Sequence, residues 1–397
     1  MIQVKDNVYW IGLKDWELRR FHGHEYSTHR GSSYNTYLIR DEKNILVDTV
    51  WTPFKNEFIE LIGKEVGFSN VHGIIVNHNE PDHGGCLDAL MDVLPKDTPI
   101  YCSPKGVESI RKHFHKDWNF VPVKTGDKIS TGKSEIMFME MTMIHWPDSM
   151  AAFVTPANVL LSNDAFGQHY ASASIFEDEA DQCEVNQEAL KYFANILTPL
   201  APLIRKKLAD LKSLNLPIEV IAPSHGVIWR KDPLRIVEKY AMWANDYHEG
   251  FVTIVYDTMY NSTKKMAEAI AKGIEKEGVR CKLYNSSATD ISDLITELFL
   301  SKGIVIGSCT VNNHYLRSIA GLMSEIKVHK FSKKLGAAFG SSGWSNAAPE
   351  KIHEQLKDAG IEVVLEPLGV KFVPTAEELE KCVEFGEEFA RKVKASI

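Results

Sequence analysis

Residues 73–83, GIIVNHNEPDH, place an apolar strand directly before a run of acidic and histidine side chains. Four potential metal ligands lie within six residues of this stretch, namely His78, Glu80, Asp82 and His83. Side chains at the end of a buried strand leave the core and reach a cleft. A cluster of titratable groups this dense does not stabilise a hydrophobic core. The pattern therefore predicts that this loop binds metal.

Three further candidate ligands follow apolar strands. His145 comes after IMFMEM, Asp164 closes NVLLSND, and His225 closes EVIAPSH. A single histidine or aspartate in such a place is usually a cap or a hydrogen-bonded core residue. We assign these three as ligands mainly because the loop at 78–83 already predicts a metal site. All seven residues together offer four imidazoles and three carboxylates. That set is more anionic than a typical zinc site and suits iron or manganese.

The chain changes character at about residue 250. Before it, short β-rich runs alternate with helices, including one long helix predicted at about 184–214. After it, five strands each precede an amphipathic helix: FVTIVYD, VRCKLYN, GIVIGS, LGAAFG and EVVLEPL. Regular βα alternation predicts a five-stranded, doubly wound parallel sheet with helices on both faces. We place the domain boundary in the polar stretch 245–250, giving domains 1–249 and 250–397.

A hydroxyl-rich loop joins the first of these strands to its helix and consists of Thr258, Met259, Tyr260, Asn261, Ser262 and Thr263. Backbone N–H groups, hydroxyls and the positive end of a helix dipole bind phosphate in such loops. The loop lacks the GxxxxGK[ST] pattern of nucleoside-triphosphate sites and the GxGxxG of dinucleotide sites. It therefore predicts a pocket for a single phosphate monoester such as that of FMN.

Two more loops follow later strands of the same sheet. They consist of Thr310, Val311, Asn312 and Asn313 after GIVIGS, and of Ser341, Ser342, Gly343 and Trp344 after LGAAFG. Parallel strands end at one edge of a sheet, so all three loops are expected to meet there. Their small residues, amides and indole suit a flat aromatic ring. Each loop alone could be an ordinary turn, but together they predict flavodoxin-like FMN binding.

The two halves together resemble the flavodiiron proteins, also called A-type flavoproteins, in their minimal class. The resemblance implies an α/β chain, with an N-terminal metallo-β-lactamase-like αββα sandwich and a flavodoxin-like second domain. The metallo-β-lactamase loop reads His-x-His-x-Asp-His, and Glu80 here replaces its second histidine. The resemblance implies that one iron is bound by His78, Glu80, His145 and Asp164, and the other by Asp82, His83, Asp164 and His225, with Asp164 bridging.

The same resemblance implies roles near the irons for His22 and Tyr192, which we take as catalytic candidates. The alternative is that both are polar residues of the core. Two positions depart from the family pattern. Phe193 stands where a second tyrosine is frequent. Cys309 stands where proline is common in the flavin loop, and either alters the flavin potential or is a small buried residue.

Two ferrous ions and a reduced flavin hold four electrons, enough to reduce dioxygen to water or two nitric oxide molecules to nitrous oxide. The sequence does not distinguish the two gases. It also leaves open whether the electron donor is a rubredoxin-like protein or a reduced deazaflavin coenzyme. Two other readings stay open at this point: a binuclear zinc hydrolase with a fused flavodoxin domain, and an electron-transfer protein whose metal domain is inert.

Charge and composition bear on the partners. The net charge of −8 and the lack of a basic block argue against nucleic acid and anionic membranes. No segment has the length of a membrane span, the N-terminus has no signal-like apolar stretch, and six cysteines are scattered without a CxxC pair. We therefore expect a cytoplasmic protein. A boundary of roughly six residues spans at most about 20 Å, which favours a head-to-tail homodimer or a dimer of such dimers.

Overall fold

The computed structural model describes residues 1–397 and divides into two compact units. Unit 1 comprises Met1–Phe21, Thr28–Phe193 and Leu200–Ala244, and unit 2 comprises His22–Ser27, Ala194–Pro199 and Asn245–Ile397. The division at Ala244 falls five residues before the boundary that we expected from the sequence. Two short segments of the first half of the chain belong with unit 2.

Two β-sheets face each other in unit 1. The first sheet contains, in spatial order, β1 (Ile2–Lys5), β2 (Val8–Trp10), β7 (Tyr37–Ile39), β8 (Asn44–Val47), β9 (Val71–Ile75), β10 (Ile100–Cys102) and β11 (Phe120–Pro122). The second contains β12 (Lys128–Ser130), β13 (Glu135–Glu140), β14 (Met150–Thr155), β15 (Val159–Asn163) and β16 (Val220–Pro223). This is the predicted αββα sandwich.

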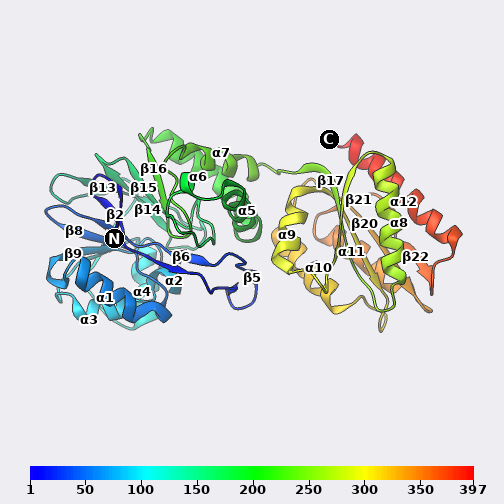
Figure 1. Ribbon diagram of the computed structural model, residues 1–397, viewed down its shortest axis with the longest axis horizontal. Helices are drawn as coiled ribbons and strands as arrows, with labels where there is room; N and C mark the ends of the chain where they lie inside the picture. The colour runs from blue at the N-terminus through cyan, green and yellow to red at the C-terminus, as the bar shows by residue number, and fades with distance from the viewer. The chain divides into compact units, whose positions relative to one another are not determined.

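Helices cover the outer faces of this sandwich (Figure 1). On one side lie α1 (Lys55–Glu65), α3 (Leu87–Val93) and α4 (Pro104–Phe114), and on the other α5 (Gln182–Tyr192), α6 (Ala201–Ser213) and α7 (Leu234–Trp243). Between the sheets, Val47 and Ile75 of the first form one buried cluster with Phe138 and Leu161 of the second. Burying a side chain of this size stabilises the fold by about 1.5–3 kcal/mol, so the core fixes both sheets.

The long helix predicted at about 184–214 is wrong, because the structure interrupts it. After α5 the chain makes a π-helical turn at Phe193–Leu197 and a 3₁₀ turn at Thr198–Leu200 before α6 begins. Pro199 and Pro202 have no backbone N–H and clash with the preceding turn, so a continuous ladder of hydrogen bonds cannot pass through them.

Unit 2 is built on a parallel sheet. Its order is β18 (Arg280–Asn285), β17 (Glu249–Asp257), β19 (Ser301–Cys309), β20 (Leu335–Ser342) and β21 (Glu362–Val363), and β22 (Leu368–Lys371) also pairs with β20. The predicted doubly wound sheet of five positions is present. Its fifth position, however, is shared by two short strands, because Pro367 interrupts the run that we expected to form one strand.

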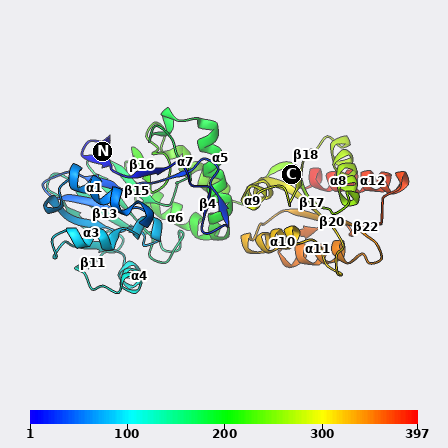
Figure 2. The same cartoon turned by 60° about the horizontal axis from the view of Figure 1, so that its bottom comes forward.

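Five helices pack on this sheet. Figure 2 shows α8 (Ser262–Lys276) and α12 (Ala376–Ala395) on one face, with α10 (Arg317–His329) and α11 (Ala347–Asp358) on the other; α9 (Ile291–Leu300) contacts α10. The capping box predicted for the last helix is present. Thr375 Oγ1 accepts a hydrogen bond from the Glu378 backbone N–H, and the Glu378 side chain accepts one from the Thr375 N–H.

Hydrogen bonds tie the two short segments of unit 2 to α9 and α10. The hydroxyls of Ser27 and Ser292 lie 2.8 Å apart, and Asn195 Nδ2 donates to the carbonyl oxygen of Ser292 at 3.0 Å. His329 Nε2 lies 2.9 Å from the carbonyl oxygen of Asn195. Elsewhere, none of the six cysteines is paired. No helix combines the length and the apolar character that crossing a membrane requires.

Candidate metal centre and flavin pocket

The seven predicted ligands come together in unit 1. His78 and Glu80 follow β9, Asp82 and His83 lie on the short helix α2 (Pro81–Gly84), His145 lies between β13 and β14, Asp164 follows β15, and His225 follows β16. They form two groups whose ligand atoms lie within 4.8 Å of one another: His78, Glu80, His145 and Asp164, and Asp82, His83 and His225.

Asp164 joins these two groups. Its Oδ2 lies 3.4 Å from His145 Nε2, and its Oδ1 lies 3.0 Å from His83 Nε2 and 3.6 Å from His225 Nε2. The side chain is 2% exposed. One carboxylate that presents a different oxygen to each group has the geometry of a bridging ligand.

A tight turn places His225 in this cluster. Gly226 has φ +72°, and a Cβ added there would lie 1.6 Å from Gln168 Oε1. Only glycine fits this backbone, which turns the chain sharply after β16. His225 Nδ1 lies 2.7 Å from the carbonyl oxygen of Ser33, so that oxygen accepts the ring N–H and Nε2 faces the cluster.

The residues fit a pair of cations. Both side-chain oxygens of Asp82 and of Asp164, together with His83 Nε2, are buried without a well-formed hydrogen bond, and they face other ligand atoms, such as His225 Nε2 at 2.9 Å from Asp82 Oδ2. An unsatisfied buried polar atom costs about 1–3 kcal/mol, so such a group persists only with a strong partner. A donor set of imidazoles and carboxylates suits two ions of the iron type.

The electrostatics of the cluster agree with this conclusion. Burial opposes a charge on the His145 ring, but its contacts with Asp164 and Glu80 outweigh burial and raise the pKa of His145 to about 10. The same balance, with Asp148 and Glu80 as partners, raises the pKa of His78 to about 9. The carboxylates thus attract positive charge to this place, which bound metal ions supply.

Two residues beside the cluster are not predicted from the sequence. Asp148 accepts a hydrogen bond from His78 Nδ1, and the ring of His169 lies 4.6 Å from that of His225. Neither follows a strand of the predicted pattern, so no sequence signal marked them.

The two catalytic candidates lie in different units. Tyr192, at the end of α5 in unit 1, is buried, and its ring lies 5.4 Å from that of His169. Burial, followed by the charge of Asp164, raises the pKa of Tyr192 well above its usual value. His22 is exposed on the turn between β4 (Arg20–Phe21) and β5 (Tyr26–Ser27), in a segment of unit 2. The catalytic role of each stays a prediction.

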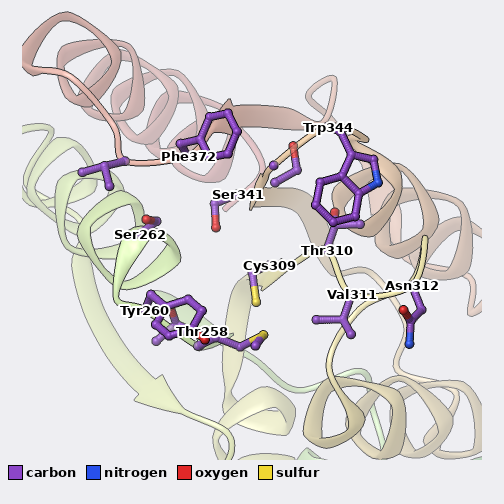
Figure 3. A pocket seen from close by; sticks show the side chains of 14 residues that line it. Thr258, Tyr260, Ser262, Cys309, Thr310, Val311, Asn312, Ser341, Trp344 and Phe372 are labelled. Atoms are coloured by element: carbon purple, nitrogen blue, oxygen red, sulfur yellow. The ribbon is translucent and has the colours of Figure 1, made fainter.

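Unit 2 contains a cavity of about 430 Å³ at the carboxyl ends of β17, β19 and β20. It is lined by Thr258, Met259, Tyr260, Ser262, Cys309, Thr310, Val311, Asn312, Ser341, Ser342, Gly343, Trp344, Phe372 and Val373. Figure 3 shows Ser262 and Tyr260 on one side of this space, Trp344 and Val311 on the other, and the Cys309 side chain between them. Hydroxyl groups at the start of α8 and an apolar wall suit a phosphate and a flat ring.

Most of the predicted flavin-binding residues line this cavity. Asn261, Thr263 and Asn313 do not; Thr263 is fully buried and its hydroxyl lies 2.9 Å from that of Ser341. Phe372 and Val373 were missed. They follow β22, which the sequence pattern predicts as part of the preceding strand.

Comparison with known proteins assigns a family to each half of the chain. Residues 33–226 match the family described as ODP family beta lactamase, and residues 254–386 match flavodoxin. The chain is 47% identical to the anaerobic nitric oxide reductase flavorubredoxins of Escherichia coli and Klebsiella pneumoniae, over 98% of this chain and 82% of theirs. The chain belongs to the flavodiiron proteins.

Solved structures of this family share the whole fold. Rubredoxin oxygen:oxidoreductase from Desulfovibrio gigas is 35% identical, with a TM-score of 0.96 over 99% of this chain and 98% of that one. The flavodiiron protein from Giardia intestinalis is 30% identical, with a TM-score of 0.94 over 100% and 97%. The family and fold predicted from the sequence are therefore confirmed, and the chain is an oxidoreductase.

The structure shows where Phe193 and Cys309, the two residues that depart from the flavodiiron pattern, are located. Phe193 is fully buried, with its ring 5.1 Å from that of Tyr240 and 5.4 Å from that of Trp243, so it packs in the core of unit 1. Cys309 lines the flavin cavity, and burial raises the pKa of its thiol. The thiol is therefore protonated at neutral pH.

Proposed function

We propose that this flavodiiron protein reduces dioxygen to water, nitric oxide to nitrous oxide, or both, at a non-haem di-iron site supplied with electrons by FMN. The observation that carries the proposal is the position of Asp164 between two groups of imidazole and carboxylate ligands. The irons and FMN, when bound, supply four electrons and Lewis acidity.

The residues of this chain would bind the two metal ions and shield them from solvent. Glu80 and Asp82 each give one half of the centre its own carboxylate, and Asp164 is shared. Glu80 and His145 are 11% and 12% exposed, whereas Asp82, His83 and His225 are at most 3% exposed. The gas therefore approaches from the side of Glu80 and His145. Tyr192 keeps its hydroxyl proton because its pKa is raised, so it is a candidate hydrogen-bond donor beside the metal centre.

Electrons reach FMN from an external donor, either a rubredoxin-like protein or a reduced deazaflavin coenzyme. Tyr260 and Trp344, which line the flavin cavity, are each 84% exposed, so the cavity is accessible to a partner. The names of two relatives, rubredoxin oxygen:oxidoreductase and flavorubredoxin, favour the protein donor. Stopped-flow reduction of bound FMN by each donor decides between them.

The test of the proposal combines composition with turnover. Purified protein should contain iron and FMN, and the reduced protein should consume dioxygen, nitric oxide or both. A protein that contains zinc, consumes neither gas and cleaves an ester would instead be the hydrolase that we considered from the sequence. Comparing the initial rates with the two gases, at equal donor concentration, gives the preferred substrate.

We further propose that the working unit is a head-to-tail homodimer, alone or paired into a tetramer, in which the flavin of one chain serves the irons of its partner. Residues 244–248 alone separate α7 from β17, and five residues span at most about 18 Å. A linker of this length favours exchange across a two-fold axis, which completes two active sites with one isologous contact.

Subunit mixing tests this arrangement. His83→Ala removes a metal ligand, and Thr258→Tyr fills the flavin pocket with a bulky ring. Each variant alone should be inactive. After subunit exchange, a mixed dimer has one intact pair of cofactors across its interface, so activity should reappear. Exchange without recovered activity would contradict the arrangement.

The cysteines and the net charge bear on the cellular location and on other partners. Six unpaired cysteines suit the reducing cytoplasm, which we propose as the location. A net charge of −8 gives no support for nucleic acid or anionic membrane as a partner. Cell fractionation with an antibody against the chain tests the location and would reveal any association with membranes.

A further inference from the structure

Asp148 is a buried carboxylate on the loop that carries His145. It is 3% exposed, and both of its oxygens have donors from the loop at 78–83. Oδ1 lies 3.1 Å from His78 Nδ1, and Oδ2 accepts a hydrogen bond from the backbone N–H of Asn79 at 2.9 Å. The backbone oxygen of Asp148 accepts a third bond, from the Ser103 hydroxyl at 2.8 Å. One residue thus holds two ligand-bearing loops together.

His78 and His225, one from each half of the metal centre, differ in this support. In the half formed by Asp82, His83 and His225, the Nδ1 atom of His225 bonds to a neutral backbone carbonyl, that of Ser33. In the other half, the Nδ1 atom of His78 faces a carboxylate, that of Asp148. A carboxylate behind an imidazole ligand fixes its tautomer and raises its basicity more than a neutral acceptor does.

We propose that Asp148 is the positioning residue for the metal bound by His78, Glu80 and His145, and that it has little effect on the metal in the other half. By holding the proton on Nδ1, it leaves the Nε2 lone pair of His78 directed at the centre, 3.2 Å from Glu80 Oε2. By accepting the Asn79 N–H, it also fixes the distance between the His78 and His145 loops. The inference rests on the proposed function only in that the centre binds two metals.

The chemistry of the position specifies a carboxylate. Two N–H donors face the two oxygens of Asp148, so both oxygens must accept. Asparagine has one acceptor oxygen and one NH₂ group, and the NH₂ would face a second donor. Asp148→Asn therefore keeps the size of the side chain but loses one hydrogen bond and the negative charge.

Equilibrium binding of Co²⁺ to the apoprotein tests the proposal. The wild type should take up two ions per chain. In Asp148→Asn one ion should bind about 10–100-fold more weakly, while the other keeps its wild-type affinity. FMN binding and the unfolding temperature of the apoprotein, measured alongside, report whether the fold is intact.

Asp41→Asn is the matched control. Asp41 lies before β8, at the opposite end of the strand from the metal loops, and its Oδ2 accepts hydrogen bonds from the N–H groups of Lys133 and Ser134. This variant loses the same kind of bond in the same unit, yet it should bind both ions as the wild type does. Asp148→Glu, which restores the charge, should recover most of the lost affinity.

Three results would overturn the proposal. The first is wild-type affinity for both ions in Asp148→Asn. The second is an equal loss at both sites while Asp41→Asn keeps both. The third needs no variant: long-range ¹H–¹⁵N spectra of the Zn²⁺-loaded wild type should show His78 protonated at Nδ1, and a proton on Nε2 would contradict the assigned role. If the wild type itself bound no metal, the proposed function would fail instead.

Discussion

The hydroxyl oxygens of Thr263 and Ser341 lie 2.9 Å apart, although 78 positions separate them in the sequence. Thr263 belongs to the first turn of α8, and Ser341 lies near the end of β20. The hydrogen bond between them joins the loop that we expect to bind the phosphate of FMN to a loop that we expect to contact its ring. Because Thr263 is fully buried, this contact holds the two walls of the flavin cavity in register.

Replacing Thr263 by valine should therefore weaken FMN binding. The substitution keeps the shape but removes one hydrogen bond, worth about 1–1.5 kcal/mol, which corresponds to about a tenfold rise in Kd. Titration of apoprotein with FMN, followed by the quenching of flavin fluorescence, measures it. Thr253→Val is the control, because Thr253 is also fully buried in unit 2 but its hydroxyl donates to the carbonyl oxygen of Glu297 and not to a residue that lines the cavity. Equal affinity in the two variants would contradict the role of Thr263.

Asp164→Ala should lose metal from both halves of the centre while keeping FMN. Asp164 contacts His145 in one half and His83 in the other, so its removal leaves each ion without a ligand. Metal content should fall from two ions per chain to well below one, and gas reduction should fall at least 100-fold. Asp117→Ala, at an exposed carboxylate of the same unit, should change neither. Full activity in Asp164→Ala would remove Asp164 from the site.

The thiol of Cys309 should be protected by FMN. It lines the flavin cavity, and its raised pKa makes it a slow nucleophile. Iodoacetamide should label Cys309 in the apoprotein and at least tenfold more slowly once FMN is bound. Cys183, exposed on α5, is an internal control that should react at the same rate in both forms. Mass spectrometry of tryptic peptides quantifies both sites, and unchanged labelling of Cys309 would place FMN elsewhere.

Lys334 should make the stability of unit 2 depend on pH. Its buried Nζ donates to the carbonyl oxygens of Phe299 and Ser301, and burial lowers its pKa to about 7. Because the folded pKa lies below the value of 10.5 in the unfolded chain, the unfolded chain binds the proton more tightly between these limits. The free energy of unfolding should therefore rise from pH 7 toward pH 10, by at most about 1.4 kcal/mol per pH unit.

Hydrogen exchange of β19 and β20 at several pH values, corrected for intrinsic rates, measures this slope. Lys334→Met should flatten it and lower the stability at high pH, since two carbonyl groups lose their donor. Lys276→Met is the control, because Lys276 is 46% exposed on α8. A slope that survives in Lys334→Met would assign the pH dependence to another group.

Local patterns in the sequence predicted much of this protein. The hydroxyl-rich loop at 258–263 and the cluster at 78–83 each lie within six residues, and each βα unit is one continuous stretch of the chain. Such features depend on the periodicity of apolar residues and on which residues follow the end of a strand, and both are local properties. The same local rules led to the wrong long helix, since the prolines that interrupt it lie within an otherwise helical pattern.

Only the tertiary structure could reveal Asp148, His169 and the wall formed by Phe372 and Val373. The contact between Asp148 and His78 spans 70 positions, and that between Thr263 and Ser341 spans 78. Whether such residues meet depends on sheet order and loop path, which the packing of two whole sheets decides. The sequence by itself determined which residues can bind metal and flavin. The fold decided which side chains hold those residues in place, because a supporting hydrogen bond needs a partner within about 3 Å in space, whatever its distance along the chain.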